Sequence, residues 1–123
     1  MKDKLAYLGS PYTKYKAGLP RAFTDVAELC ARLAGRGLHI FSPIVHAHPI
    51  AMHGGLDPLD LTIWYPWCRV MMDRSDILIV AHMEGWQESA GLRFEVDHFD
   101  RAHKPIYDLN PATLTMTKRQ VAA

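Results

Sequence analysis

The sequence predicts an α/β domain in which helices cover both faces of a parallel sheet, and two observations support this fold class. Short apolar runs bounded by Gly, Ser or Pro alternate along the chain with segments whose apolar residues recur at helical spacing. The resulting order of alternating strands and helices requires crossover connections, which join parallel neighbouring strands. A chain of 123 residues is long enough for one core, so we expect a single domain over residues 1–123.

Four strands are expected, each a short apolar run that ends at turn-forming or polar residues. They cover Leu5 to Leu8, Leu38 to Phe41, Ile77 to Ala81, and Pro105 to Leu109.

Three helices are expected between these strands. The first begins at Pro20 and ends at Gly35 or Gly37, because Pro suits the first helical turn and Gly the position after the last. The second begins at Pro66 and ends near Arg74, and the third begins at Ser89. Residues 42–64 show no clear period and are predicted as a long loop, whereas residues 111–123 are predicted as a terminal turn or frayed helix.

Composition restricts the class of ligand. The 14 basic and 13 acidic residues give a formal charge of +1, which offers no field for nucleic acid, so a small molecule is the expected partner. Cys30 and Cys68 lack metal-like spacing and are expected to be reduced thiols. No apolar run is long enough for a signal peptide or a membrane span, so we expect a cytoplasmic protein that does not contact a membrane.

The ligand crevice of a parallel α/β sheet lies beyond the carboxyl ends of its strands. Polar segments follow the first three predicted strands there, namely "GSPY", "SPIVHAHP" and "HMEGWQES". Their candidate substrate-binding residues are Gly9, Ser10, Pro11, His46, His48 and Trp86. For Trp86, stacking on a base and packing in the core are equally expected, whereas Tyr7 is assigned mainly to the core. His-x-His without a fixed third ligand is a weak metal signal, so neither a metal nor another cofactor is expected.

The segment "SAGLRFE" combines a helix cap, a helix-weakening glycine and a carboxylate. Ser89 is a good N-cap, and a helix N-terminus with free N–H groups attracts anions such as phosphate. Gly91 and Glu95 lie four residues apart on one helix face, so the missing side chain is expected to open space before the carboxylate. Taken alone, however, a single Glu is far more often a solvated surface charge, and Gly91 would then only let the helix approach a strand.

Four segments in order resemble the nucleoside 2-deoxyribosyltransferase superfamily. They are "YLGSPY", "GLHIFSPI", "SDILIVAHMEGW" and "ESAGLRFEVDHFDRAHKPI", which together span most of the chain. The resemblance implies a flavodoxin-like (Rossmann-like) fold and an Asp/Ser-x-Gly-x-x-x-Glu pattern, here Ser89, Gly91 and Glu95, that ends in a nucleophilic Glu. The version with Ser is similar to the branch that hydrolyses nucleoside 5′-monophosphates, where this Ser contacts the phosphate. The layout looks still closer to a small bacterial and phage-associated set of uncharacterised members.

The implied chemistry is attack of Glu95 on the anomeric carbon, which forms a glycosyl-enzyme that water or a second base resolves. Where the family carries a further Asp, this sequence has Cys68. Asp73 is the nearest carboxylate and is kept as a catalytic candidate, although five helical residues from Cys68 turn it away. Tyr12 is the third catalytic candidate, as a loop residue of the cleft. The missing Asp is compatible with altered chemistry, with another acid such as His46 or His48, or with no catalysis.

We therefore expect an enzyme that cleaves the N-glycosidic bond of a nucleoside 5′-monophosphate or nucleoside, by hydrolysis or base transfer. The alternative is a nucleotide-binding or sensing module that has lost the chemistry, which Cys68 favours. The resemblance also implies a homodimer or higher homo-oligomer. The sequence does not specify the base or the sugar.

Overall fold

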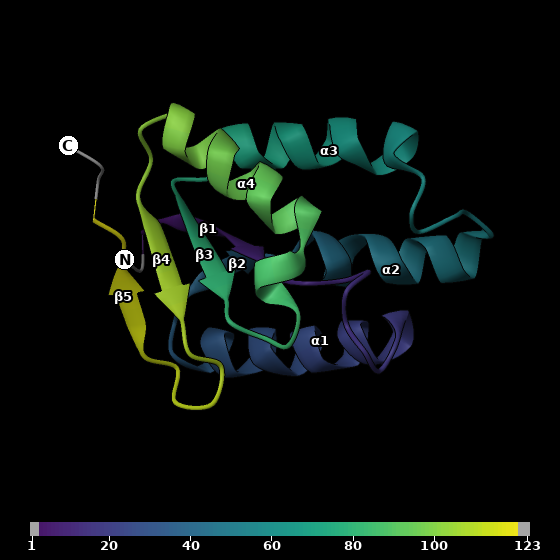
Figure 1. Cartoon of the computed structure of the whole chain (residues 1–123), viewed down its shortest axis with the longest axis horizontal. Helices are drawn as coiled ribbons and strands as arrows, with labels where there is room; N and C mark the ends of the chain where they lie inside the picture. Colours follow the sequence, from purple (N-terminus) through teal and green to yellow (C-terminus); the bar gives the residue numbers. More distant parts are fainter. Residues whose placement is uncertain (1–2, 121–123) are drawn as a thin grey trace.

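The computed structural model describes residues 3–120, in which a central sheet is covered by helices on both faces (Figure 1). The strands are β1 (Leu5–Gly9), β2 (His39–Phe41), β3 (Ile77–Ala81), β4 (Ile106–Leu109) and β5 (Met116–Lys118). The helices are α1 (Leu19–Gly35), α2 (Pro43–Gly54), α3 (Leu61–Arg74), the short 3₁₀ helix η1 (Trp86–Glu88) and α4 (Ala90–Arg101).

The strands lie in the order β2-β1-β3-β4-β5, which is the flavodoxin-like order, and β1 to β4 are parallel. The fifth strand departs from that layout, because β5 pairs antiparallel with β4 at the edge of the sheet (Figure 1). The predicted α/β class and the four parallel strands are confirmed. After β2 the chain crosses β1 to form β3, so β1 and β3 flank the point where the strand order reverses.

Successive side chains of the central strands point to opposite faces of the sheet and pack into two separate cores. Ala6 and Leu8 of β1 pack with α1 and α2 on one face, whereas Tyr7 of the same strand packs with α3 and α4 on the other. Because β3 is covered on both faces, all five of its residues are buried, as a continuous apolar run predicts.

Residues 42–64 are not one long loop, and this part of the prediction is wrong. Ser42 is the N-cap of α2, with its hydroxyl accepting a hydrogen bond from the Val45 N–H at 3.2 Å, and Pro43 follows in the first turn. Gly55 ends α2 in the left-handed conformation at φ 69°. Pro49 lies inside α2, so the sequence does not look helical there, although both ends of the helix carry ordinary capping residues.

The predicted start of the next helix at Pro66 is also wrong. Asp60 caps α3 by accepting a hydrogen bond from the Thr62 N–H at 3.0 Å, so α3 begins at Leu61 and Pro66 lies inside it. The terminal turn or frayed helix predicted for residues 111–123 is replaced, within the described part, by a turn and β5. In the same range, residues 3–120, no helix is long and apolar enough to cross a membrane.

Candidate active site at the carboxyl end of β1

Glu95 extends from α4 to the carboxyl end of β1. Its Oε1 lies 2.8 Å from the position that a β-carbon on Gly9 would occupy, and the Leu92 side chain lies 2.6 Å from the same point. The residue as a whole is half-buried, but its carboxyl group is largely enclosed by these neighbours. Burial raises the pKa of Glu95 to about 8. A glycine at position 9 is therefore what leaves room for the carboxyl group.

The Tyr7 hydroxyl and the Cys68 thiol lie beside this carboxyl group. Tyr7 is fully buried, and burial together with the neighbouring Glu95 and Cys68 raises the pKa of its phenol. Burial likewise raises the pKa of the Cys68 thiol, so both groups stay protonated at neutral pH. No hydrogen bond of ordinary geometry reaches the Tyr7 hydroxyl, although both neighbours are close enough to influence it.

Some buried polar side-chain atoms on or just after β1 and β2 lack a hydrogen-bond partner within residues 3–120. Among residues 3–120, the buried side-chain atoms without a hydrogen-bond partner are the hydroxyls of Tyr7 and Ser10 and Nε2 of His46. Tyr7 lies in the middle of β1, Ser10 directly follows that strand, and His46 lies in the first turn of α2, directly after β2. Folded proteins pair nearly all such atoms, so each of these unpaired atoms is a candidate contact for a polar ligand.

The N-terminus of α4 is built as the sequence predicted. Ser89 is the N-cap, and its buried hydroxyl accepts a hydrogen bond from the Leu92 N–H at 3.2 Å. A β-carbon on Gly91 would meet only the Ser89 hydroxyl oxygen, at 3.8 Å, and would otherwise point into open space. Gly9, rather than Gly91, is thus the glycine that the Glu95 carboxyl group requires.

Tyr12 and His48 do not join Glu95. The Tyr12 hydroxyl and His48 Nδ1 are hydrogen-bonded at 2.5 Å, and His48 stacks on Phe23 of α1 with ring centroids 4.8 Å apart. Burial lowers the pKa of His48. Tyr12 packs against the core on the α1 and α2 face, whereas Glu95 lies on the α3 and α4 face. The geometry therefore gives no support to a catalytic role for Tyr12.

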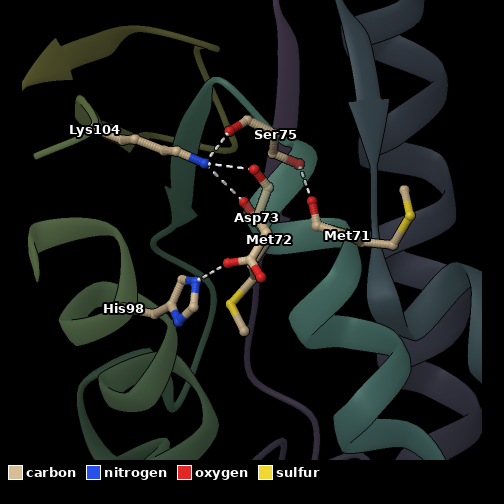
Figure 2. A network of polar contacts seen from close by, with 6 residues as sticks. All are labelled: Met71, Met72, Asp73, Ser75, His98 and Lys104. Carbon is tan, nitrogen blue, oxygen red and sulfur yellow. Dashed lines mark hydrogen bonds and ion pairs between the residues drawn. The ribbon is translucent and has the colours of Figure 1, made fainter. Parts of the chain in front are cut away.

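Asp73 is also kept away from Glu95. Its carboxylate pairs with Nε2 of His98 at 2.8 Å, at the end of α3 (Figure 2). The same corner holds the Lys104 ammonium, which donates to the backbone carbonyls of Met72, Asp73 and Ser75 at 3.2, 2.9 and 2.8 Å (Figure 2). Asp73 thus belongs to a structural network that joins α3 to α4, and the geometry does not support its predicted catalytic role.

Pro11 and Trp86, the remaining predicted residues, follow β1 and β3 respectively. Pro11 is buried after Ser10, and Trp86 packs against the core of the α3 and α4 face. The Trp86 ring stacks on His82, with centroids 3.8 Å apart and planes 10° apart. His82 is itself held by Asp108 at 2.7 Å, and Arg119 makes two hydrogen bonds to that carboxylate. Trp86 therefore has one face already covered by a protein ring.

Sequence reasoning missed Tyr7 as part of the site. Tyr7 was assigned to the core because it lies inside an apolar strand, and its ring is indeed core, packed at 5.6 Å from Phe41 and 5.9 Å from Phe99. Its hydroxyl could have marked it as a site residue, because a buried Tyr normally needs a hydrogen-bond partner inside the fold.

Surface hollows elsewhere do not reach Glu95. One lies between α1 and the segment after β3 and is lined by Tyr15, Asp25, Arg32 and His82, among others. Another lies between α4 and the edge of the sheet, beside Val96, Lys104 and Arg119. No group of three or more His, Cys, Asp or Glu side chains within residues 3–120 is placed to hold a metal ion.

A comparison with curated proteins finds none that matches this chain. A comparison with protein families finds one whose pattern matches residues 4–110, which is most of the chain and includes β1, Cys68 and Glu95. The chain therefore belongs to the family described as "Domain of unknown function (DUF1937)".

Proposed function

We propose that this protein cleaves the N-glycosidic bond of a nucleoside 5′-monophosphate or a nucleoside, with Glu95 as the nucleophile. The observation that carries the proposal is the Glu95 carboxyl group, which lies against Gly9 and Leu92 and beside the buried hydroxyl of Tyr7. A buried carboxyl group at a strand-order reversal, next to unsatisfied polar atoms, has the surroundings of a catalytic group. The resemblance to nucleoside 2-deoxyribosyltransferases supplies the reaction class.

In the proposed reaction a Glu95 oxygen attacks the anomeric carbon as the bond to the base breaks. Water then releases the sugar, or a second base accepts it. Attack requires the ionised carboxylate, and with a pKa of about 8 only about a tenth of the molecules carry it at pH 7. The Tyr7 hydroxyl favours the ionised form, because a donor beside the carboxylate lowers the pKa that burial raises.

The N-terminus of α4 is the proposed site for the 5′-phosphate. The Ser89 hydroxyl already accepts from Leu92, but its own proton and the first N–H groups of the helix can be donated to an anion. The open space beside Gly91 is compatible with this role. A side chain at position 91 would meet only Ser89 Oγ, at 3.8 Å, so packing within residues 3–120 does not require a glycine there.

A nucleotide-binding or sensing module without catalysis is the second candidate, and one observation favours it. The group beside Tyr7 and Glu95 on α3 is the neutral thiol of Cys68, and within residues 3–120 no second carboxylate influences Glu95. A module of this kind would keep the anion site and bind nucleotides without releasing base.

We further propose that the protein acts as a homo-oligomer in the cytoplasm. Apolar side chains are exposed on α3 and α4, among them Leu61, Tyr65, Val70 and Phe94, and a second copy would cover them. Cys30 and Cys68 are free thiols, which a reducing compartment preserves.

The experiment is incubation of the protein with a panel of nucleosides and nucleoside 5′-monophosphates, with free base measured by chromatography. We expect base release by wild type and a loss of at least about 100-fold in Glu95→Gln, because the amide is a poor nucleophile. Glu28→Gln, an exposed change on α1, is the control and should match wild type. Nucleotide binding without base release by wild type would favour the sensing module, and equal rates in Glu95→Gln would exclude Glu95 as nucleophile.

A further inference from the structure

Five side chains from four elements lie near Glu95 and form what we call the aromatic ring cluster: Tyr7, Phe41, His46, Trp67 and Cys68. Ring centroids lie 5.6 Å apart for Tyr7 and Phe41, 5.5 Å for Phe41 and His46, and 4.2 Å for His46 and Trp67. Cys68 follows Trp67 in α3, and its thiol returns to the Tyr7 hydroxyl. The cluster therefore joins His46 to the surroundings of the proposed nucleophile.

His46 brings an unused nitrogen to this cluster. Its Nε2 is buried and has no hydrogen-bond partner, in contrast to His48, whose Nδ1 is bonded to Tyr12. A buried nitrogen without a partner destabilises the fold, so a ligand atom that pairs with it recovers that loss. The walls beside it are aromatic, and aromatic faces suit the planar rings of a nucleobase.

The departing base needs a proton, and the other candidates near Glu95 supply it poorly. Tyr7 and Cys68 hold their protons tightly, because burial raises the pKa of each. Asp73 is committed to His98 at the end of α3. The His46 imidazole is the remaining proton donor of the cluster, and histidine is the side chain that most often serves as a general acid or base.

We propose, resting on the function proposed above, that His46 is the general acid that protonates the departing base from Nε2. As Glu95 attacks, the bond from the anomeric carbon to the base nitrogen breaks and its electron pair stays on the base. The imidazolium of His46 gives its Nε2 proton to the base and becomes neutral. Water then attacks the glycosyl-enzyme and returns a proton to His46, which frees the Glu95 carboxylate and the sugar.

The two roles require no change in the total number of protons on the site. Glu95 must lose a proton before it can attack, and His46 must hold one before it can donate. The form with Glu95 ionised and His46 charged holds the same number of protons as the form with both neutral.

The test compares two leaving groups. 2′-Deoxyguanosine 5′-monophosphate needs a proton on the departing base, whereas its 7-methyl derivative already carries a positive charge and leaves as a neutral base. We expect His46→Gln to slow base release from the unmethylated nucleotide by about 100-fold or more, the range for general acids, and release from the methylated one by less than a few-fold. His53→Gln, an exposed change on the same helix, should alter neither rate.

Both rates are measured on one preparation after subtraction of spontaneous release, so any loss of folded protein lowers them equally and leaves their ratio unchanged. An equal fall for the two nucleotides overturns the role of His46 and leaves the proposed function standing. Failure of wild type to release base from any nucleotide overturns the proposed function, and with it this inference.

Discussion

Gly9 makes the closest approach to the Glu95 carboxyl group. Gly9→Ala would place a methyl group 2.8 Å from Glu95 Oε1 and 2.6 Å from a Leu92 methyl carbon. We expect a loss of about 1–3 kcal/mol in the free energy of unfolding, the usual range for overpacking, measured by urea denaturation. Gly35→Ala at the end of α1 meets no atom within 4 Å and is the matched control. Equal destabilisation of the two variants would contradict the tight contact.

The titration of Glu95 predicts how stability depends on pH. Burial raises the pKa of Glu95 to about 8, whereas an unfolded Glu titrates near ~4.3. Between these values the folded protein keeps a proton that the unfolded chain has released, so this contribution to stability falls as pH rises. It is fully present below pH ~4.3 and is lost once the pH exceeds about 8, with a slope of at most about 1.4 kcal/mol per pH unit.

Urea unfolding of wild type and Glu95→Gln between pH 5 and pH 9 gives the difference in their free energies of unfolding. The change of this difference with pH is the slope due to Glu95. We expect the variant to gain stability relative to wild type as pH rises, because Gln does not titrate. Glu28→Gln should run parallel to wild type. Parallel curves for Glu95→Gln would mean that the carboxyl group is solvated and lacks the raised pKa.

The sequence predicted part of this site and missed the rest for definable reasons. The cap at Ser89 and the spacing from Gly91 to Glu95 are local patterns, so they could be interpreted without a fold. The contact of Glu95 with Gly9 and the approach of Tyr7 to Cys68 join residues far apart in sequence, and they depend on how α3 and α4 pack on β1. Asp73 was chosen because it is the carboxylate nearest to Cys68 in sequence, and Tyr12 because it is a loop residue after β1. In the fold, Asp73 pairs with His98 and Tyr12 with His48.

At the scale of elements, Lys104 joins the end of α3 to the start of β4. Its ammonium donates to the carbonyls of Met72, Asp73 and Ser75, which lie at or just beyond the C-terminus of α3 (Figure 2). Lys104→Met keeps a long apolar stem but removes these bonds, so we expect a loss of about 1–3 kcal/mol in the free energy of unfolding. Lys16→Met, at an exposed position, is the control for loss of charge. A change no larger than the control's would show that the bonds add nothing.

The four parallel strands and the two helices with regular periods could be predicted, whereas α2, the start of α3 and β5 could not. Pro49 and Pro66 lie inside these helices, and proline normally ends or begins one. The caps at Ser42, Asp60 and Gly55 were present in the sequence but were interpreted as loop residues. β5 was missed because it is only 3 residues long, Met116–Lys118, and follows a turn.

At the scale of the whole molecule, the exposed apolar side chains of α3 and α4 predict self-association. Tyr65 and Phe94 lie 4.9 Å apart between ring centroids, and Leu61 and Val70 are exposed on α3. We expect a dimer or larger oligomer for wild type in sedimentation experiments, and a shift toward monomer for Val70→Lys. Ala31→Lys on the exposed side of α1 should sediment as wild type does. A monomeric wild type at micromolar concentration would contradict the proposed association.

The covalent intermediate on Glu95 tests the central claim most directly. A 2′-fluoro-substituted nucleoside 5′-monophosphate slows breakdown of a glycosyl-enzyme, because fluorine destabilises the oxocarbenium-like transition state. Mass spectrometry of the intact protein after incubation should show the mass of one sugar phosphate, and peptide mapping should assign it to Glu95. Glu95→Gln should carry no adduct. Base release by wild type without any adduct, or an adduct on another residue, would contradict the role of Glu95 as nucleophile.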